Sequence, residues 1–229
     1  MEESFLASRS RLQRPSRPGT AQDHAAEWIT QSIMTGEYGP GDHIPQEDIA
    51  SKIGVSLIPV RESMHRLEGL GQLTYKQQSG YFVAELTESQ LVPMFELRKV
   101  LEDYALHKSF GMLTEDDDHE MARFESKCRT ALAEKDIVGL AHGHWSFFNA
   151  VLCGDKQPQV MRFLRHLWDT TNAYVLAYYS DTESADRTTK ARVAILDAVR
   201  NRQEDAALAA FEEHRNRTHR MLLSFIPSK

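Results

Sequence analysis

The chain has few cysteines and no long apolar segment. Cys128 and Cys153 are the only cysteines among 229 residues, and neither lies in a metal-binding motif. Two scattered cysteines exclude a disulfide framework. No apolar run approaches the roughly 20 residues of a membrane span, and the N-terminus lacks the apolar segment of a secretory signal. We therefore expect a soluble cytoplasmic protein that makes no membrane contact and in which both cysteines are structural thiols.

The motifs of common enzyme classes are also missing. The sequence contains no glycine-rich phosphate loop, no Gly-x-Ser-x-Gly nucleophile motif and no recognisable set of metal ligands. Its 41% hydrophobic residues nevertheless suffice for ordinary cores, in one large or two small domains. These absences point to a binding protein without a cofactor rather than to an enzyme.

Residues 48–71, in contrast, carry a clear helix-turn-helix pattern. A short apolar face over residues 49–53 stops at Gly54, a residue that tolerates the left-handed conformation of a helix end. Ser56 can cap a second helix, whose first turn accommodates Pro59 and whose apolar positions recur at helical spacing. The polar face of this second helix is typical of a recognition helix, whose N-terminal end enters the major groove of DNA.

The charge of this region does not by itself favour DNA binding. The chain has a net charge of -6, and residues 21–85 contain four Lys or Arg against nine Asp or Glu. Residues 1–19 are rich in Ser, Arg and Pro, and we expect a disordered basic arm there, either a plain tail or an arm that reaches the DNA backbone. Affinity for DNA would therefore depend on a few well-placed cations and on binding as a dimer.

A short hairpin is expected after the helix-turn-helix. Residues 73–76 and 81–84 are β-compatible and are separated by a turn that contains Gly80. Lys76 is the only cation of this wing. The hairpin either approaches DNA with its glycine or is a plain hairpin without a DNA contact.

From residue 87 onward the pattern is helical. Thr87 and Gln90 can form a capping box, as Thr20 and Asp23 can at the first helix of the chain, and Thr114 opens a helix with an acidic first turn. The further helical segments cover about 136–153, 158–179, 184–201 and 204–225. We predict an all-α bundle of about six helices in this half of the chain.

The N-terminal motifs resemble the winged helix of the GntR superfamily of bacterial transcription regulators. The resemblance rests on Gly36-Glu37, Pro40-Gly41, Asp48-Ile49-Ala50, Gly54-Val55-Ser56, Pro59-Val60-Arg61-Glu62 and Arg66-Leu67-Glu68. Together with the exposed helix face, it implies that the DNA-contacting residues are Ser56, Arg61, His65, Arg66, Lys76 and Gly80. Leu57 stands where the family usually has a DNA-contacting arginine, and it can offer only apolar contacts, for example to a thymine methyl group.

The C-terminal half resembles the FCD domain of the FadR-like branch of that superfamily. The resemblance rests on Phe95-Glu96-Leu97-Arg98, Leu101-Glu102, Ile195-Leu196-Asp197-Ala198, Asp205-Ala206-Ala207 and His214. Many members bind a divalent metal, and the four ligand positions fall here on Trp145, Asn149, Arg192 and His214. Only His214 retains a ligand side chain, whereas a Zn²⁺-type site needs three or four N, O or S donors. We therefore interpret the metal site as lost.

Arg192 suggests that a direct anion site has replaced the metal. Arginine binds carboxylate or phosphate through two parallel charge-assisted hydrogen bonds. Arg98 is expected to be a second anchor, with Asn149 and His214 as hydrogen-bond donors and Trp145 as an apolar wall. The alternative is a structural salt bridge from Arg192 to an acidic neighbour. His142 and His144, two residues apart on different helix faces, are interpreted as surface or core histidines.

The sequence thus predicts a mainly α protein with three parts: a basic arm (1–19), a winged helix-turn-helix domain (20–86) and an all-α, FCD-like ligand-binding and dimerisation domain (87–226). We expect a homodimeric, ligand-responsive transcription regulator on a palindromic double-stranded DNA operator, a repressor released by a small organic acid or other anionic metabolite. Two alternatives stay open. One is a metal-dependent regulator that uses His214, and the other is a winged-helix interaction protein with weakened DNA binding.

Overall fold

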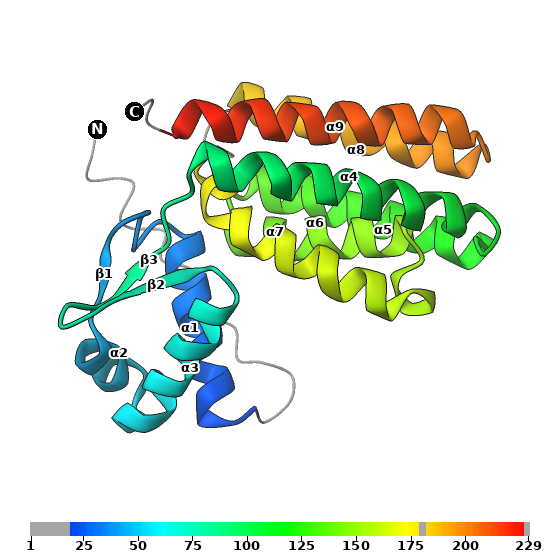
Figure 1. Ribbon diagram of the computed structural model, residues 1–229. Coiled ribbons are helices and arrows are strands. Elements are labelled where there is room, and N and C mark those ends of the chain that lie inside the picture. The colour runs from blue at the N-terminus through cyan, green and yellow to red at the C-terminus, as the bar shows by residue number, and fades with distance from the viewer. Residues whose placement is uncertain (1–18, 179–181, 227–229) are drawn as a thin grey trace.

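The computed structural model describes residues 19–178 and 182–226, so the predicted basic arm lies outside the described residues. In chain order the elements are α1 (Ala21–Met34), β1 (His43–Ile44), α2 (Gln46–Ile53), α3 (Leu57–Gly69), β2 (Leu73–Lys76), β3 (Gly80–Val83), α4 (Glu88–Phe110), α5 (Glu115–Ala133), α6 (Ile137–Val151), the 3₁₀ helix η1 (Gly154–Lys156), α7 (Pro158–Tyr178), α8 (Thr182–Arg200) and α9 (Glu204–Phe225). A three-helix unit with a small sheet precedes a bundle of long helices (Figure 1). The predicted mainly α fold class is confirmed.

The helix-turn-helix forms as its capping residues predict. Gly54 ends α2 in the left-handed conformation, with φ of 71°. Thr20 and Asp23 form the expected capping box at α1, and the hydrogen bonds from Thr20, followed by the one from Arg66, lower the pKa of the Asp23 carboxyl. Ser56 occupies the N-cap position of α3, but its side chain makes no capping hydrogen bond there. The buried face of α3, formed by Val60, Met64 and Leu67, packs against the apolar faces of α1 and α2.

The wing is a three-stranded antiparallel sheet in the order β1-β3-β2. The predicted hairpin pairs Leu73 with Val83 and Lys76 with Gly80. Gly80 has a φ of 90°, which glycine adopts readily and other residues rarely do. Strand β1 was not predicted, because two residues are too short to show an alternating pattern.

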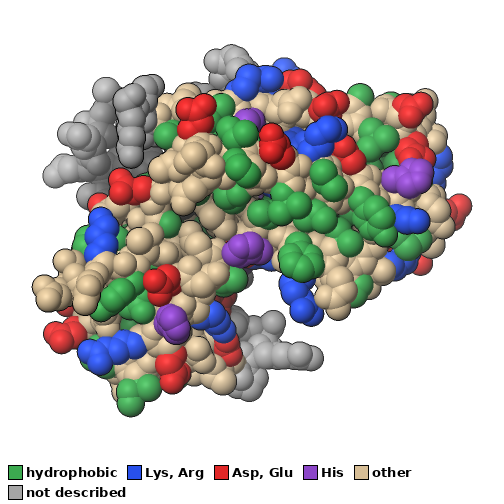
Figure 2. Space-filling view, viewed as in Figure 1, with side chains coloured by type: hydrophobic (Ala, Val, Ile, Leu, Met, Phe, Trp, Pro, Cys, Tyr) green, Lys and Arg blue, Asp and Glu red, His purple; other side chains and the backbone are tan. Residues whose placement is uncertain are grey.

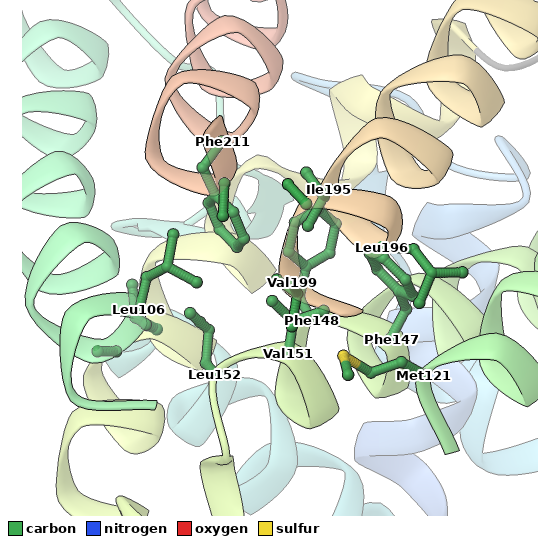
Figure 3. Packing of buried hydrophobic residues seen from close by; sticks show 14 of the residues in the cluster. Leu106, Met121, Phe147, Phe148, Val151, Leu152, Ile195, Leu196, Val199 and Phe211 are labelled. Carbon is green, nitrogen blue, oxygen red and sulfur yellow. The ribbon is translucent and has the colours of Figure 1, made fainter. Parts of the chain in front are cut away.

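The helices of the bundle pack around one apolar core, to which α4, α5, α6, α7, α8 and α9 contribute side chains. Figure 3 shows side chains of α4, α5, α6, α8 and α9 meeting at its centre, among them Leu106, Met121, Phe148, Val199 and Phe211. The six helices predicted for this half are present within the described residues, although α6 ends at Val151 rather than at Cys153. None of the described helices is both long and apolar enough to cross a membrane.

A buried carboxylate joins three of these helices. Glu102 of α4 is 1% exposed, and its Oε1 accepts hydrogen bonds from Arg98 Nε and from Trp168 Nε1 of α7, each at 3.0 Å. Its Oε2 accepts from Nη1 of the buried Arg215 of α9 at 2.9 Å. A buried charge needs partners of this kind, because each ion loses several kcal/mol of hydration. The arrangement therefore fixes α4, α7 and α9 relative to one another.

The bundle meets the N-terminal unit mainly through α7, which packs against α1. Thr170 Oγ1 on α7 donates a hydrogen bond to the carbonyl of Leu70, the C-cap residue of α3, at 3.1 Å. The same helix carries Trp168, which donates to Glu102. Helix α7 thus connects the interior of the bundle to the end of the recognition helix.

Candidate DNA-binding face and candidate effector site

The exposed face of α3 carries Ile58, Arg61, Glu62 and His65. These positions follow one another at helical spacing and lie opposite the buried residues of the same helix. Arg61 Nε donates to Oε1 of Gln46, at the start of α2, at 2.9 Å. This bond orients the guanidinium and occupies one of its five N–H donors, so the others can contact DNA.

The other residues of α3 that are predicted to contact DNA differ in their exposure and in their partners. Arg66 Nη1 donates to Asp23 Oδ1 of α1 at 3.0 Å, and its side chain is 43% exposed. His65 is more accessible, with a side chain that is 81% exposed and lies 3.2 Å from Glu68. Arg66 therefore has a structural partner on α1, whereas His65 and Arg61 extend from the open face.

The two apolar residues that open α3 have different environments. Leu57 is partly buried and packs against the core of the N-terminal unit, whereas Ile58 is 69% exposed. The apolar contact that the sequence suggested for Leu57 is therefore offered by Ile58 instead. The periodicity already contains this signal, since Leu57 precedes Val60 and Met64 by three and seven positions, at the spacing of one buried helix face.

The wing carries the predicted Lys76 and Gly80 at its tip. Lys76 Nζ lies 4.3 Å from the centroid of the Phe82 ring, a cation–π distance that holds the side chain along the sheet. A Cβ on Gly80 would lie 3.1 Å from Nε2 of His43, which is an exposed residue of β1. His43 is thus a further polar group of the wing, and sequence analysis missed it because the two-residue β1 is too short to show a pattern.

Inside the bundle, Arg192 of α8 is 1% exposed yet has few hydrogen-bond partners. Its Nη2 donates to Thr189 Oγ1 at 3.2 Å, while Nε and Nη1 have no hydrogen-bond partner. The salt bridge that was the alternative interpretation is not found among the described residues. A buried guanidinium whose donors are mostly unpaired is unfavourable unless an anion joins it.

The other buried arginines are paired, unlike Arg192. Arg98 makes both of its hydrogen bonds to Glu102 and lies 4.7 Å and 5.2 Å from the ring centroids of Phe95 and Trp168. Arg215 donates to Glu102 and to Asp103. Arg98 therefore stabilises the bundle through Glu102. Nη2 of Arg215 also has no hydrogen-bond partner, but among the buried arginines described Arg192 is the one without a carboxylate partner.

Two histidines lie near this group, the buried His214 and the partly buried His144. The rings of His144 and His214 are 5.5 Å apart, and His214 stacks on Phe148 at 5.0 Å. Burial, followed by the charges of Arg98, Arg217, Arg192 and Arg215, lowers the pKa of His214 to about 3. Burial and then the charge of His214 bring the pKa of His144 well below its usual range. Both rings are therefore neutral near pH 7, in a region of positive potential.

The helix α6 presents His144 and Phe148 to His214 rather than the predicted Trp145 and Asn149. Trp145 is half-buried and packs edge-to-face on Trp168 at 5.4 Å. Asn149 lies at the C-terminal end of α6, where its Oδ1 would be 2.0 Å from a Cβ built on Gly154. Within the described residues no hydrogen bond or ring contact joins either of them to Arg192 or His214. The four-residue spacing of His144 and Phe148 is the signal that sequence reasoning missed.

The residues of this region do not fit the divalent metal that the resemblance implies. No group of three or more His, Cys, Asp or Glu side chains suitable for a metal ion occurs in the part of the chain that the structure describes. His144 and His214 supply two imidazoles, and a guanidinium stands at a position where the resemblance implies a third ligand. This donor set suits an anion better than a cation.

Comparison with known proteins identifies the family of each half of the chain. Residues 21–83 match the family of bacterial regulatory proteins called gntR, and residues 93–217 match the FCD domain. The chain is 21% identical over 183 residues to the uncharacterised HTH-type transcriptional regulator YdhC of Bacillus subtilis, covering 78% of this chain and 80% of YdhC. It is 24% identical over 153 residues to the HTH-type transcriptional repressor GlaR of Escherichia coli, covering 64% and 69%. The solved structure of E. coli McbR/YncC superposes with a TM-score of 0.76 at 19% identity, over 89% of this chain and 97% of that one, which shows the shared fold.

The lowered histidine pKa values predict that the protein loses stability in mild acid. Between pH 6.5 and about pH 3 the unfolded chain binds a proton at His214 that the folded chain does not, so the free energy of unfolding falls as the pH falls through this window. One such group contributes a slope of about 1.4 kcal/mol per pH unit. Urea unfolding at pH 7, 6 and 5 should show this slope, and it should be smaller in His214→Gln.

The matched control is His142→Gln, which alters an exposed histidine of α6. It should keep the slope of the parent. An unchanged slope in His214→Gln would show that His214 is protonated in the folded protein and that the region is not positive.

Proposed function

The chain belongs to the GntR family of bacterial regulatory proteins and carries an FCD domain, and on this premise we propose that it is a dimeric repressor released by a small anion. Family membership makes it a DNA-binding transcription regulator with a C-terminal effector domain, and not an enzyme. Repression is supported by relatives such as GlaR, which is named a transcriptional repressor. We place the DNA-binding domain at residues 20–86 and the effector domain at residues 87–226.

The proposed DNA-binding surface is the open face of α3 with the wing beside it. It contains the predicted contacts Ser56, Arg61, His65, Arg66, Lys76 and Gly80. Arg61 has the strongest support, because Gln46 orients its guanidinium while most of its donors remain available. An oriented arginine at this place in a recognition helix suits the two acceptor atoms of guanine, O6 and N7.

We propose that two copies dock through the face shared by α4 and α7. Four large hydrophobic side chains are exposed there: Leu97 (48%), Val100 (64%), Tyr104 (51%) and Phe163 (61%). Figure 2 shows hydrophobic side chains gathered over these two helices, which pack against each other. A contiguous exposed apolar patch favours a protein–protein interface. A palindromic operator requires a dimer with a two-fold axis, so a second copy of this chain is the partner that we propose for this patch.

The effector proposal rests on Arg192. Its buried guanidinium has unpaired donors at Nε and Nη1, and the neighbouring histidines are held neutral by burial and by positive charge. A carboxylate or phosphate group would accept charge-assisted hydrogen bonds, each contributing about 1.5–3 kcal/mol. A small organic acid or a phosphorylated metabolite is therefore the ligand class that this interior suits.

The DNA-binding role predicts that Arg61→Ala weakens operator binding. Losing a base contact costs about 1–3 kcal/mol in each half-site, and a dimer loses it twice. The measurement is a titration at physiological salt of DNA sites selected from a random library, with a footprint that should show two half-sites related by a two-fold axis. Arg123→Ala, which removes an exposed arginine of α5, is the control and should bind like the parent. Parental affinity of Arg61→Ala, or a single asymmetric half-site, would refute the assignment.

The effector role predicts that anionic metabolites stabilise the parent protein but not Arg192→Ala. A ligand at about a hundred times its dissociation constant adds roughly 2.7 kcal/mol, which a thermal-shift screen of carboxylic and phosphorylated metabolites detects. Arg123→Ala should respond like the parent. Chelator should change neither stability nor DNA binding. The idea fails if a stoichiometric divalent metal copurifies with the parent, or if an effector keeps its affinity in Arg192→Ala.

A further inference from the structure

We propose that Ile58 reads the C5-methyl group of a thymine and so determines part of the operator sequence. This inference rests on the proposed DNA-binding role of α3. It adds a specificity-determining residue that the charged contacts do not include. The supporting observation is an exposed apolar side chain at the N-terminal end of α3. This end of a recognition helix is the part that contacts the bases in the major groove.

Ile58 is not part of the apolar core of the described residues. It is the second residue of α3 and, at 69%, the most exposed large hydrophobic side chain among the described residues. The core-facing positions at this end of the helix are already taken by Leu57 and Val60. Truncating Ile58 should therefore leave the fold and its stability nearly unchanged.

Ile58 lies on the helix face that we propose contacts DNA. Arg61, Glu62 and His65 follow it by three, four and seven positions, and all are exposed. Residues at this spacing share a helix face. Three residues of helix advance about 4.5 Å, compared with about 3.4 Å per base pair, so Ile58 and Arg61 reach the same or neighbouring base pairs.

The chemistry of the groove selects thymine as the partner. In the major groove thymine presents its C5-methyl group beside the O4 acceptor, whereas cytosine, guanine and adenine present hydrogen-bonding groups and no methyl group. An isoleucine gains free energy by burying that methyl and would desolvate a polar base edge without compensating it. Ile58 therefore favours thymine and disfavours the other three bases at its position.

The test uses DNA sites selected from a random library with the full-length protein, in which single thymines are replaced by deoxyuridine. That replacement removes only the methyl group. At one thymine position, replacement in a single half-site should weaken binding by the parent about fourfold, the effect of one buried methyl, and replacement in both half-sites about sixteenfold. Ile58→Ala loses the contact in both half-sites of the dimer, so it should bind at least about sixteenfold more weakly than the parent and show no further loss at that thymine.

Arg61→Ala serves as the matched control, since it should weaken binding overall and still show the fourfold loss at that thymine. If no DNA can be selected, the proposed function fails and this inference with it. If DNA is bound but no thymine methyl affects affinity, or if Ile58→Ala keeps the parental sensitivity to deoxyuridine, only the assignment of Ile58 is overturned.

Discussion

The arrangement of the effector domain depends on the buried carboxylate of Glu102. It accepts hydrogen bonds from its own helix, from Trp168 of α7 and from Arg215 of α9, and so joins three helices at one point. Removing one partner of such a buried pair costs about 3–5 kcal/mol, because the remaining charge is left without compensation. Trp168 lies two residues from Thr170, which bonds to the C-cap of the recognition helix. A change at the bundle interior thus has a direct structural route to the DNA-binding domain.

The donors to Glu102 are Arg98, Trp168 and Arg215, whereas Arg192 has no carboxylate partner among the described residues. The resulting excess of positive charge adds to burial in holding His144 and His214 in their neutral forms. A neutral imidazole can donate or accept a hydrogen bond, but it carries no charge that would attract or repel an anion. In the proposed effector site the guanidinium of Arg192 is therefore the group that would attract an anion, and binding of an anion there would relieve an unfavourable buried charge.

The sequence predicted the architecture well where local rules decide it. Gly54, the capping boxes and the helical periodicity located the helix-turn-helix and the six helices of the bundle. It predicted the buried site less well, because which α6 side chains face inward depends on the rotation of the helix against α7 and α9. His144 and Phe148 face His214 for that reason, and Asn149 does not. The pairing of Arg98 with Glu102 could be read from their four-residue spacing, but the lack of a carboxylate partner for Arg192 among the described residues emerges only from the packed structure.

The most direct test of this account is the stability of Arg192→Met in the absence of any effector. Urea unfolding in a buffer whose only anions are too large to enter the bundle compares the two proteins without a ligand for the guanidinium. Because the parent then contains a buried and mostly unpaired charge, the account predicts that Arg192→Met is at least as stable as the parent. If the substitution instead lowers the free energy of unfolding by about 3–5 kcal/mol, Arg192 belongs to a structural ion pair and is not an anion-binding group.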